Sequence, residues 1–162
     1  TNVLRALILD YAVRRAFEPS DETRDLFCAN LAMQCFSHKH LREDAFTAAL
    51  LRDIGGRITR ARGSSSPLSA ARLSAHLLAS WGLPYTIVEA VAHQDEPSAI
   101  PHEGLDLVDA VHAAALLVEH QLDGRSEALE LARAHFERIG TADRIARLRT
   151  IAEHWLAQPE LS

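Results

Sequence analysis

The chain has 162 residues, of which 48% are hydrophobic, and this length is typical of a single domain with one core, here residues 1–162. Its net charge of −5 argues against nucleic acid or an anionic membrane surface as a partner. No apolar run approaches the roughly 18 residues that a membrane-spanning helix needs, and the start shows no signal peptide, so we expect a cytoplasmic protein.

Apolar residues recur at spacings of three and four along almost the whole chain, and no stretch alternates polar with apolar residues at the length of a strand. The pattern predicts an all-α fold, a compact single-domain bundle of about seven to nine helices. The first predicted helix carries an apolar stripe of Leu4, Leu7, Ile8 and Tyr11. Thr1 begins almost inside this helix, and we therefore expect the chain to be the C-terminal fragment of a longer protein.

The second predicted helix is marked by six apolar residues at helical spacing, Phe27, Cys28, Leu31, Ala32, Cys35 and Phe36. Its two cysteines are separated by seven residues, which on one helix is roughly 10 Å between Cα atoms. This distance is too long for a disulfide. We expect both cysteines to be buried free thiols in a reducing compartment.

A third helix is predicted to begin near Arg42. The pair Gly55-Gly56 falls inside or just after it, where glycine lowers helix stability unless a close approach or a turn requires it.

Two segments predict breaks between the following helices. Residues 63–67 (GSSSP) have the composition of a loop. In the segment WGLP, Gly82 is expected to end one helix and Pro84 to begin the next, so we expect a tight corner there. The two tryptophans, Trp81 and Trp155, are expected to be core anchors.

Three further helices are predicted beyond the loop around residues 97–104. The first runs from about Leu105 to Asp123. Ser126 and Thr141 are the expected N-caps of the other two.

Three segments taken together resemble the HDOD domain, an HD-superfamily output module of bacterial signalling proteins that is found C-terminal to receiver domains in response regulators. They are residues 45–55 (AFTAALLRDIG), residues 81–93 (WGLPYTIVEAVAH) and residues 105–117 (LDLVDAVHAAALL). The first is similar to a run ending in Leu-His-Asp-Ile-Gly, and the third to the last core helix of the family. The resemblance covers most of residues 1 to about 155 and implies a helical output domain of a two-component system.

The resemblance also places the metal ligands of active HD enzymes on positions of this chain. They fall at Ala29, Arg52, Asp53, Ala70, His93, Gln94 and Ala115. Only Asp53 and His93 are of a type that ligates metal, because a guanidinium such as that of Arg52 has no lone pair to give. Two protein ligands fall short of the three that a catalytic zinc keeps. The resemblance therefore implies a degenerate site with no metal, no cofactor and no catalytic residue.

Other polar residues favour structural roles. Asp53 and His93 are expected to remain as a hydrogen-bonded pair, and His112 to pair with Asp109 on one helix face.

Three arginines, Arg57, Arg60 and Arg62, crowd one short segment. They are a candidate anion-binding site for a phosphate-bearing ligand. A solvated basic helix end is the favoured interpretation, because cations are stabilised there.

These patterns favour a non-catalytic signalling output domain that acts through protein contacts. The expected partner is an upstream receiver domain or another signalling protein, and a homodimer is also considered. Two alternatives stay open. One is a divergent HD-type metal-dependent phosphohydrolase or cyclic-nucleotide phosphodiesterase with Asp53 and His93 among its ligands. The other is a nucleotide-sensing module.

Overall fold

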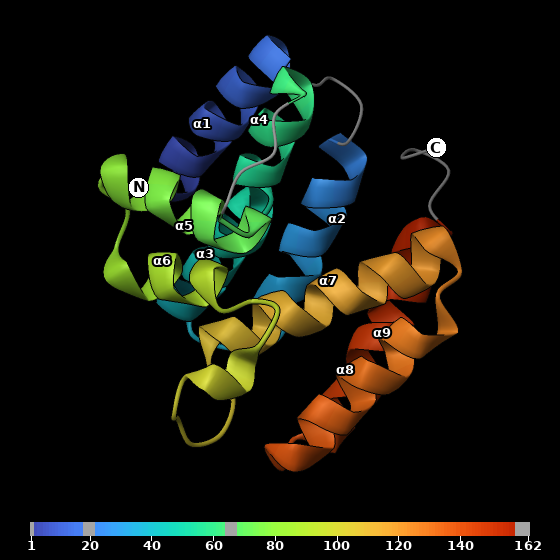
Figure 1. Ribbon diagram of the computed structural model, residues 1–162. Coiled ribbons are helices and arrows are strands. Elements are labelled where there is room, and N and C mark those ends of the chain that lie inside the picture. The colour runs from blue at the N-terminus through green and yellow to red at the C-terminus, as the bar shows by residue number, and fades with distance from the viewer. Residues whose placement is uncertain (1, 18–21, 64–67, 158–162) are drawn as a thin grey trace.

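The computed structural model describes residues 2–17, 22–63 and 68–157, and in these ranges the fold is all-helical, as the periodicity predicted (Figure 1). Nine α-helices and one 3-10 turn follow one another in the described ranges: α1 (Asn2–Phe17), α2 (Glu22–Met33), α3 (Lys39–Leu51), α4 (Ile54–Arg62), α5 (Ala70–Ser80), α6 (Tyr85–Ala92), η1 (Pro97–Ala99), α7 (Leu107–Asp123), α8 (Ser126–Arg138) and α9 (Ala142–Leu156). None of them is long and apolar enough to cross a membrane.

Helix α3 lies at the centre of the bundle, packed against α1, α2, α6 and α7. Helix α7 crosses from this group toward the C-terminal helices, and α8 and α9 form a helical hairpin at its far side (Figure 1). Helix α9 also reaches back to α2, where the rings of Phe27 and Trp155 stack with centroids 4.4 Å apart. Trp155 is thus a core anchor, as expected.

The apolar set predicted for the second helix is entirely buried. Phe27, Cys28 and Ala32 have no exposed surface, and Leu31, Cys35 and Phe36 have at most 8%. Helix α2 ends at Met33, however, so Cys35 lies in the turn after the helix and not on it. Both cysteines are free and buried, as predicted.

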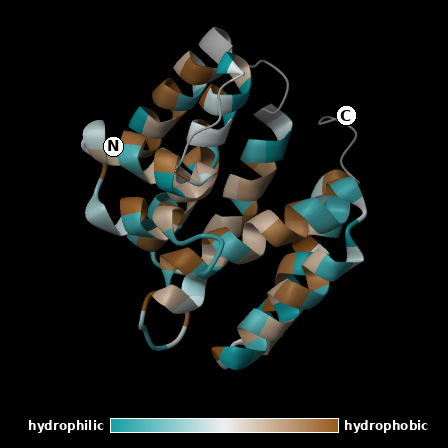
Figure 2. Ribbon diagram, viewed as in Figure 1, coloured by the Kyte–Doolittle hydropathy of each residue, from teal (hydrophilic) through white to brown (hydrophobic). Residues whose placement is uncertain are grey.

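Helix α1 has an unusual polarity, because its apolar stripe faces outward. Leu4, Leu7, Ile8 and Tyr11, which we call the α1 stripe, are 40% to 63% exposed. The inward face instead carries the small residues Ala6 and Val13 and the buried Asp10, and Arg5 donates hydrogen bonds to the carbonyl oxygens of Trp81 and Gly82. Figure 2 shows the hydrophobic residues along α1.

The paired glycines lie in the first turn of α4, where close approaches require them. A Cβ atom on Gly55 would lie 2.5 Å from the backbone nitrogen of Ser74 in α5, and one on Gly56 would lie 2.3 Å from Oδ1 of Asp53. The backbone N–H of Gly55 donates to the Ser74 hydroxyl at 2.9 Å. The packing of α4 on α5 therefore requires glycine at position 55, whereas Gly56 leaves room for the side chain of Asp53.

The WGLP corner forms as predicted. Trp81 is the C-cap of α5, Gly82 has a positive φ of 71°, and Pro84 is the N-cap of α6. The N–H of Leu83 donates to the carbonyl of Leu78 at 3.1 Å, which closes the helix end. Trp81 is partly buried against the core.

The later helices begin close to the predicted positions. Thr141 is the N-cap of α9, but Ser126 is the first residue of α8 and Arg125 is its N-cap. Helix α3 begins at Lys39, three residues before the predicted start. Most of the predicted 63–67 loop, residues 64–67, lies outside the described residues.

The Phe27–Trp155 stack predicts a large loss of stability for Phe27→Ala. Truncating a fully buried aromatic side chain typically costs about 3–5 kcal/mol through lost burial and the cavity left behind. Chemical denaturation of wild type and variant measures this change. Tyr85→Ala is the control, because Tyr85 is 74% exposed and its loss should change the free energy of unfolding by about 0.5 kcal/mol or less. Equal effects of the two substitutions would contradict the stacked arrangement.

Candidate functional site

Arg52 makes polar contacts that involve three helices. The resemblance implies a metal-ligating histidine at this position. It is the C-cap of α3, and its Nη1 donates to Oε1 of Gln94 at 3.4 Å. The Gln94 amide nitrogen in turn donates to the carbonyl oxygens of Arg52 at 2.9 Å and of Val91 at 3.0 Å. Gln94, only 5% exposed, follows the end of α6. The ends of α3 and α6 are therefore joined through Arg52.

The charge of Arg52 is stabilised by its surroundings. Burial opposes this charge, but the nearby Cys28, Asp53 and Glu119 outweigh burial and raise the pKa of Arg52 above the usual arginine value. Burial acts in the opposite direction on the neighbouring Cys28, where it raises the pKa of the thiol. Glu119 comes from α7, so Arg52 also links α3 electrostatically to that helix.

The other predicted site residues differ in how deeply they are buried. Ala29 is fully buried on α2, next to Cys28, and Ala115 is partly buried on α7, one turn before Glu119. Ala70 is the exposed first residue of α5, outside this buried group.

Asp53 pairs with Arg60 and not with His93. Its Oδ2 lies 2.9 Å from Nη2 of Arg60, seven residues along the chain. His93 is the half-buried C-cap of α6, and within the described part of the chain its side chain has no hydrogen bond. The prediction that Asp53 and His93 form a pair is therefore wrong, because the Asp53 carboxylate pairs with Arg60 instead.

The residues around Arg52 do not fit a metal centre. The guanidinium repels a cation and offers no lone pair, and the Asp53 carboxylate is already paired. Across the described ranges, no group of three or more His, Cys, Asp or Glu residues is arranged to hold a metal ion.

The three clustered arginines do not form one anion-binding site. Arg57 is 3% exposed and forms ion pairs with Asp10 of α1, at 3.4 Å, and with Asp25 of α2. A side chain buried between two carboxylates is not available to an external anion. Arg60 is paired with Asp53, and Arg62 is exposed in the last turn of α4.

A second polar cluster, which we call the His–Asp cluster, is buried between α7 and α8. Asp109, with no exposed surface, lies at its centre. Its Oδ1 lies 2.6 Å from Nε2 of His135, and its Oδ2 lies 2.8 Å from Nε2 of His102. Arg138 donates to Nδ1 of His135 at 2.6 Å. The N–H of Asp106 also donates to Oδ2, which completes a capping box at the start of α7.

The hydrogen-bond partners determine the protonation states in this cluster. A guanidinium only donates, so Nδ1 of His135 accepts from Arg138, and Nε2 of His135 donates to Asp109. His102 faces two acceptors, the carbonyl oxygen of Ile100 at 2.7 Å and the Asp109 carboxylate. Both its ring nitrogens therefore donate, and His102 is an imidazolium. The cluster is a charged pair, His102 and Asp109, to which His135 adds a hydrogen bond.

The pKa shifts agree with this assignment. Burial disfavours the charge on His102, but its hydrogen bonds to Ile100 and Asp109 outweigh burial and raise the pKa of His102. Burial also works against the charge of Asp109, but hydrogen bonds from His135, the Asp106 N–H and His102 lower the pKa of Asp109. The cluster thus holds the segment before α7 against α8.

His112 does not pair with Asp109, in contrast to the prediction. Its Nδ1 lies 2.7 Å from the carbonyl oxygen of Gln94, to which it donates. Burial is the main cause that lowers the pKa of His112, so this side chain is neutral. Its ring contacts that of His135 edge-on, with centroids 5.1 Å apart. Gln94 therefore contacts Arg52 through its side chain and His112 through its backbone.

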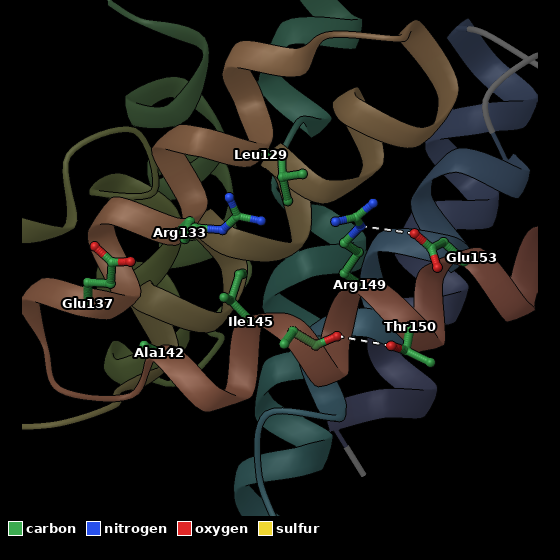
Figure 3. A pocket seen from close by; sticks show the side chains of 9 residues that line it. Leu129, Arg133, Glu137, Ala142, Ile145, Arg149, Thr150 and Glu153 are labelled. Carbon is green, nitrogen blue, oxygen red and sulfur yellow. Dashed lines mark hydrogen bonds and ion pairs between the residues drawn. The ribbon is translucent and has the colours of Figure 1, made fainter.

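Several concave surfaces lie near the C-terminal hairpin. A cavity of about 390 Å³ borders the His–Asp cluster at His102, His135 and Arg138. Another, of about 420 Å³, is a groove between α8 and α9. In this groove, charged side chains, including Arg133 and Arg149, surround Leu129 and Ile145 (Figure 3), and the exposed pair Arg149–Glu153 borders it. The residues that line the α8–α9 groove have neither the shifted pKa values nor the buried polar contacts of the His–Asp cluster.

The His–Asp cluster was missed in the sequence because its members are far apart. His135 lies 26 residues after Asp109, and His102 lies seven residues before it in irregular chain. The capping box of Asp106 and Asp109 was the one local signal that a D-x-x-D pattern could have provided.

The His–Asp cluster predicts that His102→Gln destabilises the protein more in mild acid than in mild alkali. Because the pKa of His102 is raised, its charged pair contributes fully below about pH 6.5, the ordinary histidine value, and this contribution is lost as pH rises through the folded-state pKa. Urea denaturation at pH 5.5 and pH 8.5 measures the difference. His76→Gln, at an exposed position of α5, is the control and should change stability by about 0.5 kcal/mol or less. A larger loss at pH 8.5 would refute the imidazolium assignment.

Comparison with known proteins provides no relative from which a function could be transferred. The chain matches no protein-family profile, no curated protein and no solved structure. A function must therefore be inferred from the side chains and their contacts.

Proposed function

We propose that the chain is a non-catalytic regulatory output domain that acts through protein contacts, downstream of a receiver or another input domain. The single observation that carries this proposal is the position of Arg52. A fixed positive charge, close to the carboxylates of Asp53 and Glu119 and hydrogen-bonded to Gln94, lies where the resemblance implies a metal. The cation that a phosphohydrolase would recruit is replaced by a side chain that joins α3 to α6.

The α1 stripe supports the part of the proposal that concerns protein contacts. Leu7 and Ile8 are 40% and 60% exposed, and exposed apolar patches typically mark interaction surfaces. Two charged residues of this helix, Arg5 and Asp10, are engaged with the body of the protein. An apolar partner surface fits the exposed leucine and isoleucine side chains best.

We propose a second copy of the chain as the occupant of the α1 stripe. A twofold axis would place the same apolar stripe against itself, and the spacing of three and four residues allows the two rows of side chains to interdigitate. The dimer would be the form in which the domain presents itself to a signalling partner. Docking of a receiver domain on the same face is the competing occupant.

The proposal that the domain is non-catalytic predicts that neither the wild type nor Arg52→His binds a metal ion through Asp53. One restored ligand leaves the other alanine and glutamine positions unable to coordinate, so no metal-dependent turnover is expected. Elemental analysis after dialysis and assays with bis(p-nitrophenyl) phosphate measure both properties. Near-stoichiometric metal in the wild type that disappears in Asp53→Ala would favour the phosphohydrolase alternative.

The proposed contact through the α1 stripe predicts that the wild type self-associates. Ile8→Glu should raise the dissociation constant by about tenfold or more, because a charge replaces a desolvated apolar contact. Sedimentation equilibrium of both proteins measures the dissociation constant. Leu131→Glu is the matched control, since Leu131 is an exposed leucine on α8, away from α1. A wild type that stays monomeric at all concentrations rejects the second copy. Binding of a purified receiver domain that is lost in Ile8→Glu would then identify the other occupant.

A further inference from the structure

A small polar cavity lies where the C-terminal end of α2 meets the first turns of α3 and α9. Its volume is about 250 Å³, and its lining includes three arginines, Arg42, Arg144 and Arg147. One carboxylate, that of Asp143, also lines it. Three guanidinium groups against one carboxylate leave two positive charges around this cavity, in a chain whose net charge is −5.

Two of these arginines are held in place by the main chain. Nη1 of Arg42 donates to the carbonyl oxygen of Phe36 at 3.0 Å, and Nη1 of Arg144 donates to the carbonyl oxygen of Cys35. Both carbonyls lie just after α2, so the two guanidiniums hold the turn that follows this helix. Each guanidinium has five N–H groups, so further donors remain for a ligand.

Arg147 has no such structural role. It is exposed, and within the ranges that the structure describes its guanidinium has no hydrogen bond or ion pair. Bonding to the turn after α2 therefore accounts for Arg42 and Arg144 but not for Arg147, which borders the same cavity from the next turn of α9.

Two helix beginnings add to the positive potential. His38 and Thr141 are the N-caps of α3 and α9, and neither side chain accepts a hydrogen bond from its helix. The first N–H groups of both helices thus lack side-chain caps, and such groups favour anions. Arg42 belongs to α3, and Asp143 and Arg144 belong to the first turn of α9, so both helix beginnings lie at the cavity.

We propose that this cavity binds a small phosphate-bearing anion, with Arg42, Arg144 and Arg147 as its ligands. Guanidinium groups donate charge-assisted and often bidentate hydrogen bonds to phosphate oxygens. The volume lies below the roughly 300–1,000 Å³ of sites for drug-sized molecules, which favours a phosphoryl group with a small substituent or none. This site is independent of the proposed protein contacts, because it lies at α2, α3 and α9 and not on α1.

The probes are inorganic phosphate and adenosine 5′-monophosphate, titrated into the purified chain at constant ionic strength by isothermal calorimetry. Adenosine is the uncharged control. Arg147→Gln should weaken phosphate binding by about tenfold, because it removes charge-assisted hydrogen bonds. Asp143→Asn should strengthen binding, because it removes the one carboxylate. Arg149→Gln, two residues further along α9 and bordering the α8–α9 groove, should leave the affinity within about twofold.

The two probes distinguish the source of the phosphate. Equal affinities would identify the phosphoryl group alone as the ligand, and tighter binding of the nucleotide would identify a nucleoside monophosphate. Lack of binding by both, or equal weakening by Arg147→Gln and Arg149→Gln, would overturn the proposal. Circular dichroism confirms the fold of each variant, and Asp143→Asn tests the site by a gain of affinity, which a folding defect cannot produce.

Discussion

The buried ion pairs of Arg57 hold the N-terminal part of the bundle in its arrangement. One guanidinium from α4 faces Asp10 of α1 and Asp25 of α2, and all three residues are at most 6% exposed. Buried charges are tolerated only when they are paired, so α4 is constrained to one position between these helices. The same helix begins at Gly55 and Gly56, which allow it to approach α5 and leave room for Asp53. The position of Arg52, directly before this turn, follows from those constraints.

Helix positions could be predicted from the sequence, but the outward face of α1 could not. Spacing shows which residues share a face of a helix and does not show what that face meets. The orientation of α1 depends on Arg5 and the buried Asp10, whose partners lie in the Trp81–Gly82 corner and in α4. These partners are more than 45 residues away in the sequence. Conversely, the apolar residues from Phe27 to Phe36 were correctly expected in the core, because their side chains share one face and none of them is polar.

The candidate site was accessible to sequence reasoning only in part. The resemblance predicted that Arg52 and Gln94 belong to the same site, and their side chains are in contact. It did not show that Arg60 takes the Asp53 carboxylate, or that Arg57 is buried, because both depend on the path of α4 after the glycines. The His–Asp cluster depends on the packing of α7 against α8, which no local pattern specifies.

The two tryptophans of the chain lie in different parts of this arrangement, which makes them separate natural fluorophores. Trp81 lies at the α5–α6 corner, where its backbone carbonyl accepts a hydrogen bond from Arg5. Trp155 is stacked on Phe27 where α9 meets α2. Indole emission shifts to longer wavelength when the ring becomes solvated. Single-tryptophan variants can therefore distinguish detachment of the C-terminal hairpin from opening of the N-terminal bundle, and so show whether the domain unfolds as one cooperative unit or in two steps.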